Sequence, residues 1–237
     1  MSTVLLLTSF DTREKEVMLL KGFIQEQGCD VITLDISTGT CREGVADFSC
    51  RHATAELAID FEVPSTTSNT YLTMDYVILA GLSIARKLYN EGKIDGLAGI
   101  GGTSNVTIVS HIMKEFPFGI PKLILTSSAA IPAYAAKFFA NTDITVFHSC
   151  VEINTLNVFV RDILHRFAGM VAGTLKASKK KLGKGPPAIA ISEFKFSETC
   201  TARVRELLEE KGYQAVPFSA TGPGERIMER MVEKGYL

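Results

Sequence analysis

A glycine-rich stretch near the middle of the chain carries the residue types best suited to chemistry. Residues 94–107 read IDGLAGIGGTSNVT, a short apolar run that ends in glycines and hydroxyl residues just before an amphipathic segment. Glycine lets the backbone approach a ligand, and at a strand-to-helix turn backbone N–H groups converge with the positive end of the helix dipole. Thr103 and Ser104 can in addition cap the helix. We therefore predict a phosphate or carboxylate site at Gly101, Gly102, Thr103, Ser104 and Asn105.

The pattern of this stretch differs from two common nucleotide-binding motifs. It is not the dinucleotide fingerprint GxGxxG, and no Gly-Lys-Ser/Thr follows it as in a phosphate loop. A tight turn that binds nothing is therefore the alternative interpretation.

Polar residues also follow two other apolar runs. Asp11 and Thr12 come after the expected strand 4–8, and Thr126, Ser127 and Ser128 come after the expected strand at 122–125. Because open α/β sheets bind ligands at the carboxyl ends of their strands, we expect these residues to contribute to the same site, with Asp11 holding Mg²⁺ through water. The alternative is that these side chains only cap helices.

A third polar group, His148, Ser149 and Cys150, follows an apolar run at 145–147. It contains the residue types of a base and of nucleophiles. Adjacent residues of a strand point to opposite faces, however, and no carboxylate lies at a spacing suited to orient the histidine. We therefore do not predict a catalytic triad here.

The order of apolar runs and amphipathic segments predicts an α/β fold with a mostly parallel sheet and helices on both faces. Residues 37–51 lack periodicity, so we expect an irregular excursion at the sheet edge. Strands are expected at 4–8, 31–36, 122–125 and 145–147, with a further strand leading into the glycine-rich turn, and helices at 13–27, 71–90, 104–115 and 154–177.

A lysine- and proline-rich segment, residues 179–187, reads KKKLGKGPP and is typical of a linker. It separates an expected first domain, 1–178, from a second, 188–237, in which the opening βαβ pattern recurs and leads to another glycine-rich turn with Gly222, Gly224 and Arg226. Two strands make a poor independent sheet. We therefore expect either a truncated chain or a last strand that pairs with the first domain or with another subunit.

The composition limits the classes of partner. The 237 residues are 46% hydrophobic and carry a net charge of −1, and no apolar run is long enough to cross a membrane. We expect a cytoplasmic protein that binds a small molecule rather than nucleic acid or a membrane. The five cysteines are scattered without a Cys-x-x-Cys pair, so reduced thiols are expected.

Six segments of the chain together resemble the Tm-one-like ATP-binding family. They are FDTREKE at 10–16, GIGGTS at 99–104 with Thr107, PKLILT at 121–126, TDI at 142–144, EIN at 152–154 and ATGPGER at 220–226. Pro223 and Glu225 stand where that family usually has Thr and Gly, and Glu225 places a negative charge beside the turn. The resemblance implies two Rossmann-like lobes, the second only begun in this chain, together with ATP binding and a tendency to form a homodimer.

Three hypotheses for function follow from these observations. The first is a nucleotide-binding protein in which the two glycine-rich turns hold the phosphates of ATP with Mg²⁺. The second is an enzyme that acts on a small phosphorylated or carboxylated metabolite, with Asp11, Asp143 or His148 as acid or base. The third is a non-catalytic sensor that closes on a small ligand.

Overall fold

Six parallel strands form the sheet of the first of two units into which the chain divides near residue 180. The computed structural model describes residues 1–39, 43–53, 72–139, 141–178 and 185–237. The order across the sheet is β3-β2-β1-β4-β5-β6, and every neighbouring pair is parallel. The predicted α/β fold is therefore confirmed. The strands are β1 (Ser2–Thr8), β2 (Cys29–Asp35), β3 (Phe48–Ser49), β4 (Gly96–Ile100), β5 (Lys122–Thr126) and β6 (Thr145–His148).

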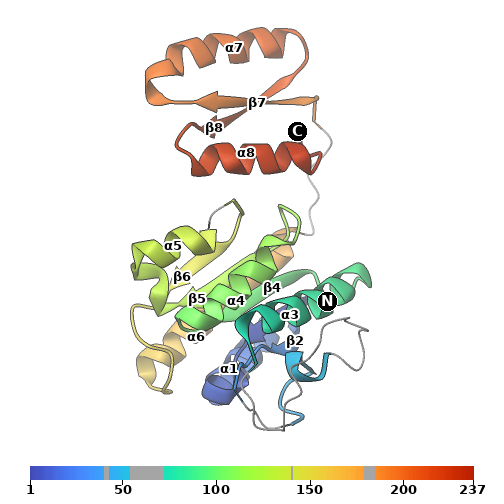
Figure 1. Ribbon diagram of the computed structural model, residues 1–237, viewed down its shortest axis with the longest axis vertical. Helices are drawn as coiled ribbons and strands as arrows, with labels where there is room; N and C mark the ends of the chain where they lie inside the picture. The colour runs from blue at the N-terminus through green and yellow to red at the C-terminus, as the bar shows by residue number, and fades with distance from the viewer. Residues whose placement is uncertain (40–42, 54–71, 140, 179–184) are drawn as a thin grey trace. The chain divides into compact units, whose positions relative to one another are not determined.

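Helices cover both faces of this sheet (Figure 1). α1 (Phe10–Glu26) and α6 (Val158–Ser178) pack together on one face, and α3 (Met74–Asn90), α4 (Thr103–Lys114) and α5 (Pro132–Phe139) lie on the other. Strand β1 supplies both cores in alternation, with Leu5 and Leu7 on the α3–α4 side and Val4 and Leu6 on the α1–α6 side. All four are fully buried, which explains why β1 is a continuous apolar run.

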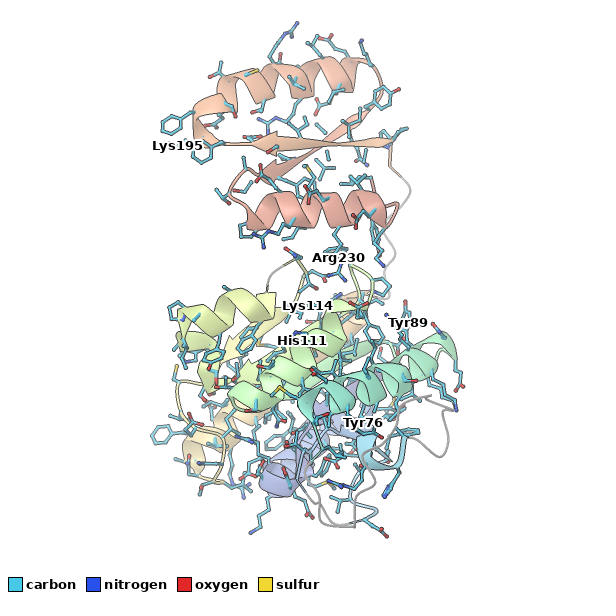
Figure 2. The ribbon with its side chains drawn as sticks, viewed as in Figure 1. Tyr76, Tyr89, His111, Lys114, Lys195 and Arg230 are labelled. Atoms are coloured by element: carbon cyan, nitrogen blue, oxygen red, sulfur yellow. The ribbon has the colours of Figure 1, made fainter. Side chains whose placement is uncertain are left out.

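Two tyrosines of α3 anchor that helix to its neighbours (Figure 2). The buried Tyr76 donates a hydrogen bond from its hydroxyl to the carbonyl of Cys50, at 3.3 Å. The ring of Tyr89 meets that of Phe116 edge to face, with centroids 5.6 Å apart. These contacts fix α3 at both ends, so the face of the sheet that carries α4 is firmly packed.

Two sequence expectations differ from the structure. The irregular excursion at 37–51 is wrong at Phe48–Ser49, which pairs with β2 as β3, because two residues are too short to show a period. The helix expected at 154–177 begins only at Val158, since the Asn157 side chain accepts the N–H of Val160 at 3.0 Å and so starts the helix there.

The second unit contains a two-stranded parallel sheet, β7 (Ala188–Glu193) with β8 (Gln214–Ser219), and the helices α7 (Glu198–Glu210) and α8 (Pro223–Glu233). Within residues 185–237 Thr201 is the one buried residue, so this unit has little core. In the described part of the chain β8 pairs with β7 alone. The linker expected at 179–187 lies largely outside the described residues and stays a prediction.

Among the described residues, none of the helices combines the length and the apolar character needed to cross a bilayer.

Candidate functional site

The direction in which the chain adds strands across the sheet reverses between β1 and β4, although the two strands are parallel. From β1 the chain continues to β2 on one side, and from β4 it continues to β5 on the other. Open α/β sheets bind ligands at the carboxyl edge beside such a reversal. The two turns that leave β1 and β4 are linked there, because the Ser9 hydroxyl donates to the Asn105 side-chain oxygen at 2.7 Å and both residues are buried.

The predicted glycine-rich turn lies at this position, and it ends at the start of α4. The expected capping by Thr103 and Ser104 is wrong: Gly102 is the N-cap, and it has no side chain to cap the helix. Among the described residues, no hydrogen-bond acceptor meets the N–H groups of Gly102, Thr103, Ser104 and Asn105. The preceding Gly101 N–H, in contrast, donates to the Leu125 carbonyl at 3.2 Å. This first turn of α4 is therefore open to an anion.

The two glycines of the turn are required for different reasons. A Cβ atom on Gly101 would overlap the side chain of Asn105, so this glycine lets the buried asparagine pack over the turn. A Cβ atom on Gly102 would lie 3.4 Å from Nη2 of Arg13 and meet nothing closer in the described residues. Gly102 therefore faces free space that is bordered by a guanidinium group.

Arg13 is a candidate site residue that the sequence did not point to by itself. Its Nε donates to the Ile153 carbonyl at 3.0 Å and its Nη1 to the Thr12 hydroxyl at 3.1 Å, while Nη2 makes no hydrogen bond to the described residues. The backbone of Arg13 leaves the helical region at φ −141°, ψ 24°, which kinks α1 at this residue. The available signal was an arginine close behind β1 and within the FDTREKE segment.

Two N–H groups in the first turn of α1 already have acceptors within the protein. The N–H of Phe10 donates to the Asp35 carboxylate and the N–H of Asp11 to the Ser37 hydroxyl, both at 3.2 Å. Ser9, not Asp11, is the N-cap, so the capping alternative for Asp11 is wrong. The Asp11 and Thr12 side chains are exposed beside Arg13, and a magnesium role for Asp11 stays a prediction.

The hydroxyl residues after β5 lie on the other side of the glycine-rich turn. The Ser128 and Thr103 hydroxyls are 2.8 Å apart, which joins this segment to α4. Thr126 is fully buried, and its hydroxyl accepts the N–H of Ser128 at 3.0 Å. This side chain therefore caps the short helical turn at Ser127–Ala130, which was the alternative to a ligand role. Ser127 donates to the exposed Glu152 carboxylate at 2.8 Å.

The acid–base candidates of the enzyme hypothesis do not lie together. Asp143 precedes β6, at the amino edge of the sheet, where its carboxylate accepts the N–H of Gly119 at 2.7 Å and pairs with Lys122 at 2.6 Å. His148 ends the same strand, at the carboxyl edge. Asp143 therefore cannot act beside Asp11 or His148.

In the second glycine-rich turn, the carboxylate of Glu225 already accepts a backbone N–H at the start of the helix. Gly222 is the N-cap of α8 with φ +76°, and its N–H donates to the Glu225 carboxylate at 3.3 Å. A Cβ atom on Gly224 would overlap the Ser219 carbonyl, so this glycine serves the packing of α8 on β8. Arg226 is exposed, and a ligand role for Gly222, Gly224 and Arg226 stays a prediction.

These features define an α/β protein with a Rossmann-type sheet order and a candidate anion site at the reversal between β1 and β4. The chain belongs to the uncharacterised protein family UPF0261, because the model of that family's N-terminal domain matches residues 2–180 and the model of its C-terminal domain matches residues 186–237.

Two relatives show how far the resemblance extends. A UPF0261 protein of Clostridium tetani is 26% identical over 238 residues, which cover 99% of this chain and 57% of that protein. The ToMV resistance protein Tm-1(GCR237) of Solanum lycopersicum is 32% identical over 161 residues, which cover 66% of this chain and 21% of that protein. The chain thus spans little more than half of the bacterial relative. The resemblance to the Tm-one-like family is confirmed as a relationship in sequence, since the tomato Tm-1 protein is among the relatives of this chain.

Among solved structures, MurG of Acinetobacter baumannii matches 98% of this chain and 64% of its own, with 14% identity and a TM-score of 0.35. A similarity of this size supports no inference about the ligand, and the strand order of the chain itself defines the fold.

Proposed function

We propose that this chain binds a nucleotide, ATP, with its phosphates at the first turn of α4. One observation carries the proposal: the N–H groups of residues 102–105 meet no acceptor among the described residues, and the open side of Gly102, where they begin, is bordered by the guanidinium of Arg13. Backbone N–H groups at a helix start and an arginine are the usual donors to phosphate oxygens.

The neighbouring side chains fit the charge and the size of a phosphate chain. Gly102 leaves room for an oxygen close to the backbone, and the Thr103 and Ser128 hydroxyls stand on the far side of the turn from Arg13. Asp11, exposed two residues before Arg13, would hold Mg²⁺ through water and so offset part of the phosphate charge. The proposal rests on the first unit alone.

We expect slow hydrolysis of the bound nucleotide. The sequence has no Gly-Lys-Ser/Thr phosphate loop, whose lysine neutralises charge on the terminal phosphates. Asp143, one candidate for a base, lies at the opposite edge of the sheet. Binding rather than turnover is therefore the expected property.

Thermal unfolding with ATP, ADP and AMP, each with and without Mg²⁺, tests the proposal directly. A ligand that binds the native state raises the midpoint by mass action. We expect a rise that requires Mg²⁺ and decreases from ATP to AMP. If no nucleotide shifts the midpoint, the nucleotide proposal is wrong, and phosphorylated or carboxylated metabolites become the next ligands to test.

Replacing Gly102 with valine should abolish most binding while leaving the fold intact. The branched side chain fits the backbone, since Gly102 has an extended conformation at φ −82°, ψ −172°, but it fills the space in front of Arg13. We expect ATP affinity to fall by at least about tenfold, the loss of roughly one charge-assisted hydrogen bond. Calorimetric titration of both proteins measures this change. An unchanged affinity would remove this turn from the site.

Replacing Arg13 with glutamine should lower ATP affinity by about tenfold, because a charged donor to phosphate is lost. Lys15→Gln is the matched control: it removes the same charge from an exposed position of the same helix. We expect the control to keep its affinity within about twofold, since exposed charges are screened by salt. Equal losses in both variants would show that only the net charge matters and that Arg13 does not contact the ligand.

A further inference from the structure

His148 and Cys150 form a thiol–imidazole pair at the carboxyl end of β6. His148 is the last residue of the strand, and Cys150 lies two positions later with a left-handed backbone, at φ +60°. The Cys150 sulfur is 3.6 Å from Nδ1 of His148, within hydrogen-bond distance for a thiol. Cys150 lies beyond the end of β6, so the turn through Ser149, and not the alternation of a strand, brings its sulfur beside the His148 ring.

The segment that carries the pair is held by its own hydrogen bonds. Ser149, between the two, is buried, and its N–H donates to the Thr126 carbonyl at 3.1 Å. Its hydroxyl donates to the Val151 carbonyl at 2.6 Å. Ser149 thus fixes the turn from the inside while both reactive side chains face solvent. This arrangement leaves the sulfur accessible and keeps the imidazole beside it.

We propose that Cys150 is a reactive thiol that adds to small α,β-unsaturated carbonyl compounds, with His148 as its proton acceptor. The thiol proton moves to Nδ1, and the sulfur forms a bond to the β-carbon of the electrophile. The π electron pair moves to the α-carbon through the carbonyl and takes the proton back from the imidazolium. The product is a thioether, and no other reactant is consumed. A neighbouring base activates a cysteine nucleophile in this way.

The other described cysteines provide internal comparisons. Cys29 and Cys50 are buried. Burial raises the pKa of the Cys50 thiol far above its ordinary range, and the nearby charge of Asp35 raises it further, so this thiol stays neutral. Cys200 is exposed like Cys150 but has no histidine beside it in the described residues. Cys200 differs from Cys150 in more than the histidine, because it lies in the first turn of α7, so the His148→Gln variant is what isolates the effect of His148.

N-ethylmaleimide, an α,β-unsaturated imide, is a suitable probe. The intact protein is treated with a limiting amount, quenched at a series of times and digested, and the modified fraction at each cysteine is measured by peptide mass spectrometry. We expect Cys150 to react about ten times faster in the natural protein than in His148→Gln, in which the thiol has no neighbouring base.

His148→Gln is the decisive variant, because glutamine keeps a hydrogen-bond acceptor but takes no proton. We expect the rate at Cys150 to fall about tenfold, while the buried Cys29 and Cys50 of the same unit stay unmodified and report an intact fold. Replacement of an exposed residue at the end of an edge strand should not unfold the protein. A Cys150 rate that His148→Gln leaves unchanged would overturn the proposal.

Discussion

Replacing Asp35 with alanine should lower the free energy of unfolding by about 3 to 4 kcal/mol, because a buried acceptor of several hydrogen bonds is lost. Asp35 is 2% exposed. Its carboxylate accepts the N–H groups of Phe10 and Ser37, at 3.2 and 3.0 Å, and the hydroxyls of Ser37 and Ser49. These bonds join the ends of β2 and β3 to the start of α1, so their loss leaves buried donors without partners.

Urea denaturation of the variant and of Asp30→Ala measures this effect. Asp30 is an exposed aspartate of the same strand, so its replacement controls for the loss of a carboxylate from β2. We expect the control to change the free energy by less than about 0.5 kcal/mol. If Asp35→Ala stays within 1 kcal/mol of the control, water replaces the carboxylate at α1 and our account of this contact is wrong.

The role of Asp35 also bears on where a ligand binds. In many open α/β sheets the first strand-to-helix turn receives the phosphates. Here the protein's own side chains accept the N–H groups of Phe10 and Asp11, whereas no acceptor among the described residues meets those of residues 102–105 at the start of α4. The contrast between these two helix starts, rather than the glycines alone, identifies residues 102–105 as the candidate site.

The sequence predicted the sheet and most helices because burial imposes regular periods. Val4–Leu7 and Leu123–Leu125 are apolar without interruption since both faces of their strands are covered. A strand that is too short to show a hydrophobic period was not predicted, as was the case for the two residues of β3. Helix starts were also misplaced, because capping depends on which side chain reaches the end of the helix and not on residue type alone.

The candidate site was predicted in part for a similar reason. Glycines such as Gly101 leave a clear pattern, and the turn lies where that pattern placed it. The position of Arg13 beside Gly102 and the contact of Asp35 with Phe10 join segments far apart in the sequence, so residue type and spacing alone did not show either of them. Short hydroxyl side chains such as Thr126 bond to the nearest backbone group, which the residue type alone does not reveal, and a ligand role for Thr126 stays a prediction.

Replacing Asp143 with asparagine should lower the free energy of unfolding by about 3 kcal/mol, because it removes the carboxylate that pairs with the buried ammonium of Lys122. The Lys122 side chain is fully buried, whereas that of Asp143 is 35% exposed, and their charged atoms are 2.6 Å apart. Lys122 also donates to the Pro117 carbonyl at 2.5 Å, which holds the ammonium inside. Thermal and urea unfolding measure the loss.

Two further variants separate the charge from the hydrogen bonds. Asp162→Asn breaks an exposed pair with Arg166 on α6 and should cost less than about 0.5 kcal/mol. Lys122→Met removes the buried charge together with its need for a partner, so we expect it to cost less than Asp143→Asn. If Lys122→Met costs more, packing and hydrogen bonds of the lysine outweigh its charge.

Asp143→Asn also tests whether Asp143 contributes to the ligand site, as the enzyme hypothesis allows. Asp143 lies at the amino edge of the sheet, whereas the open turn of α4 lies at the carboxyl edge. Asp143→Asn should therefore reduce stability while the affinity of the folded protein for ATP stays within about twofold, since the charge acts through its contact with Lys122. A large loss of affinity at a temperature where the variant is fully folded would show that the two edges are coupled.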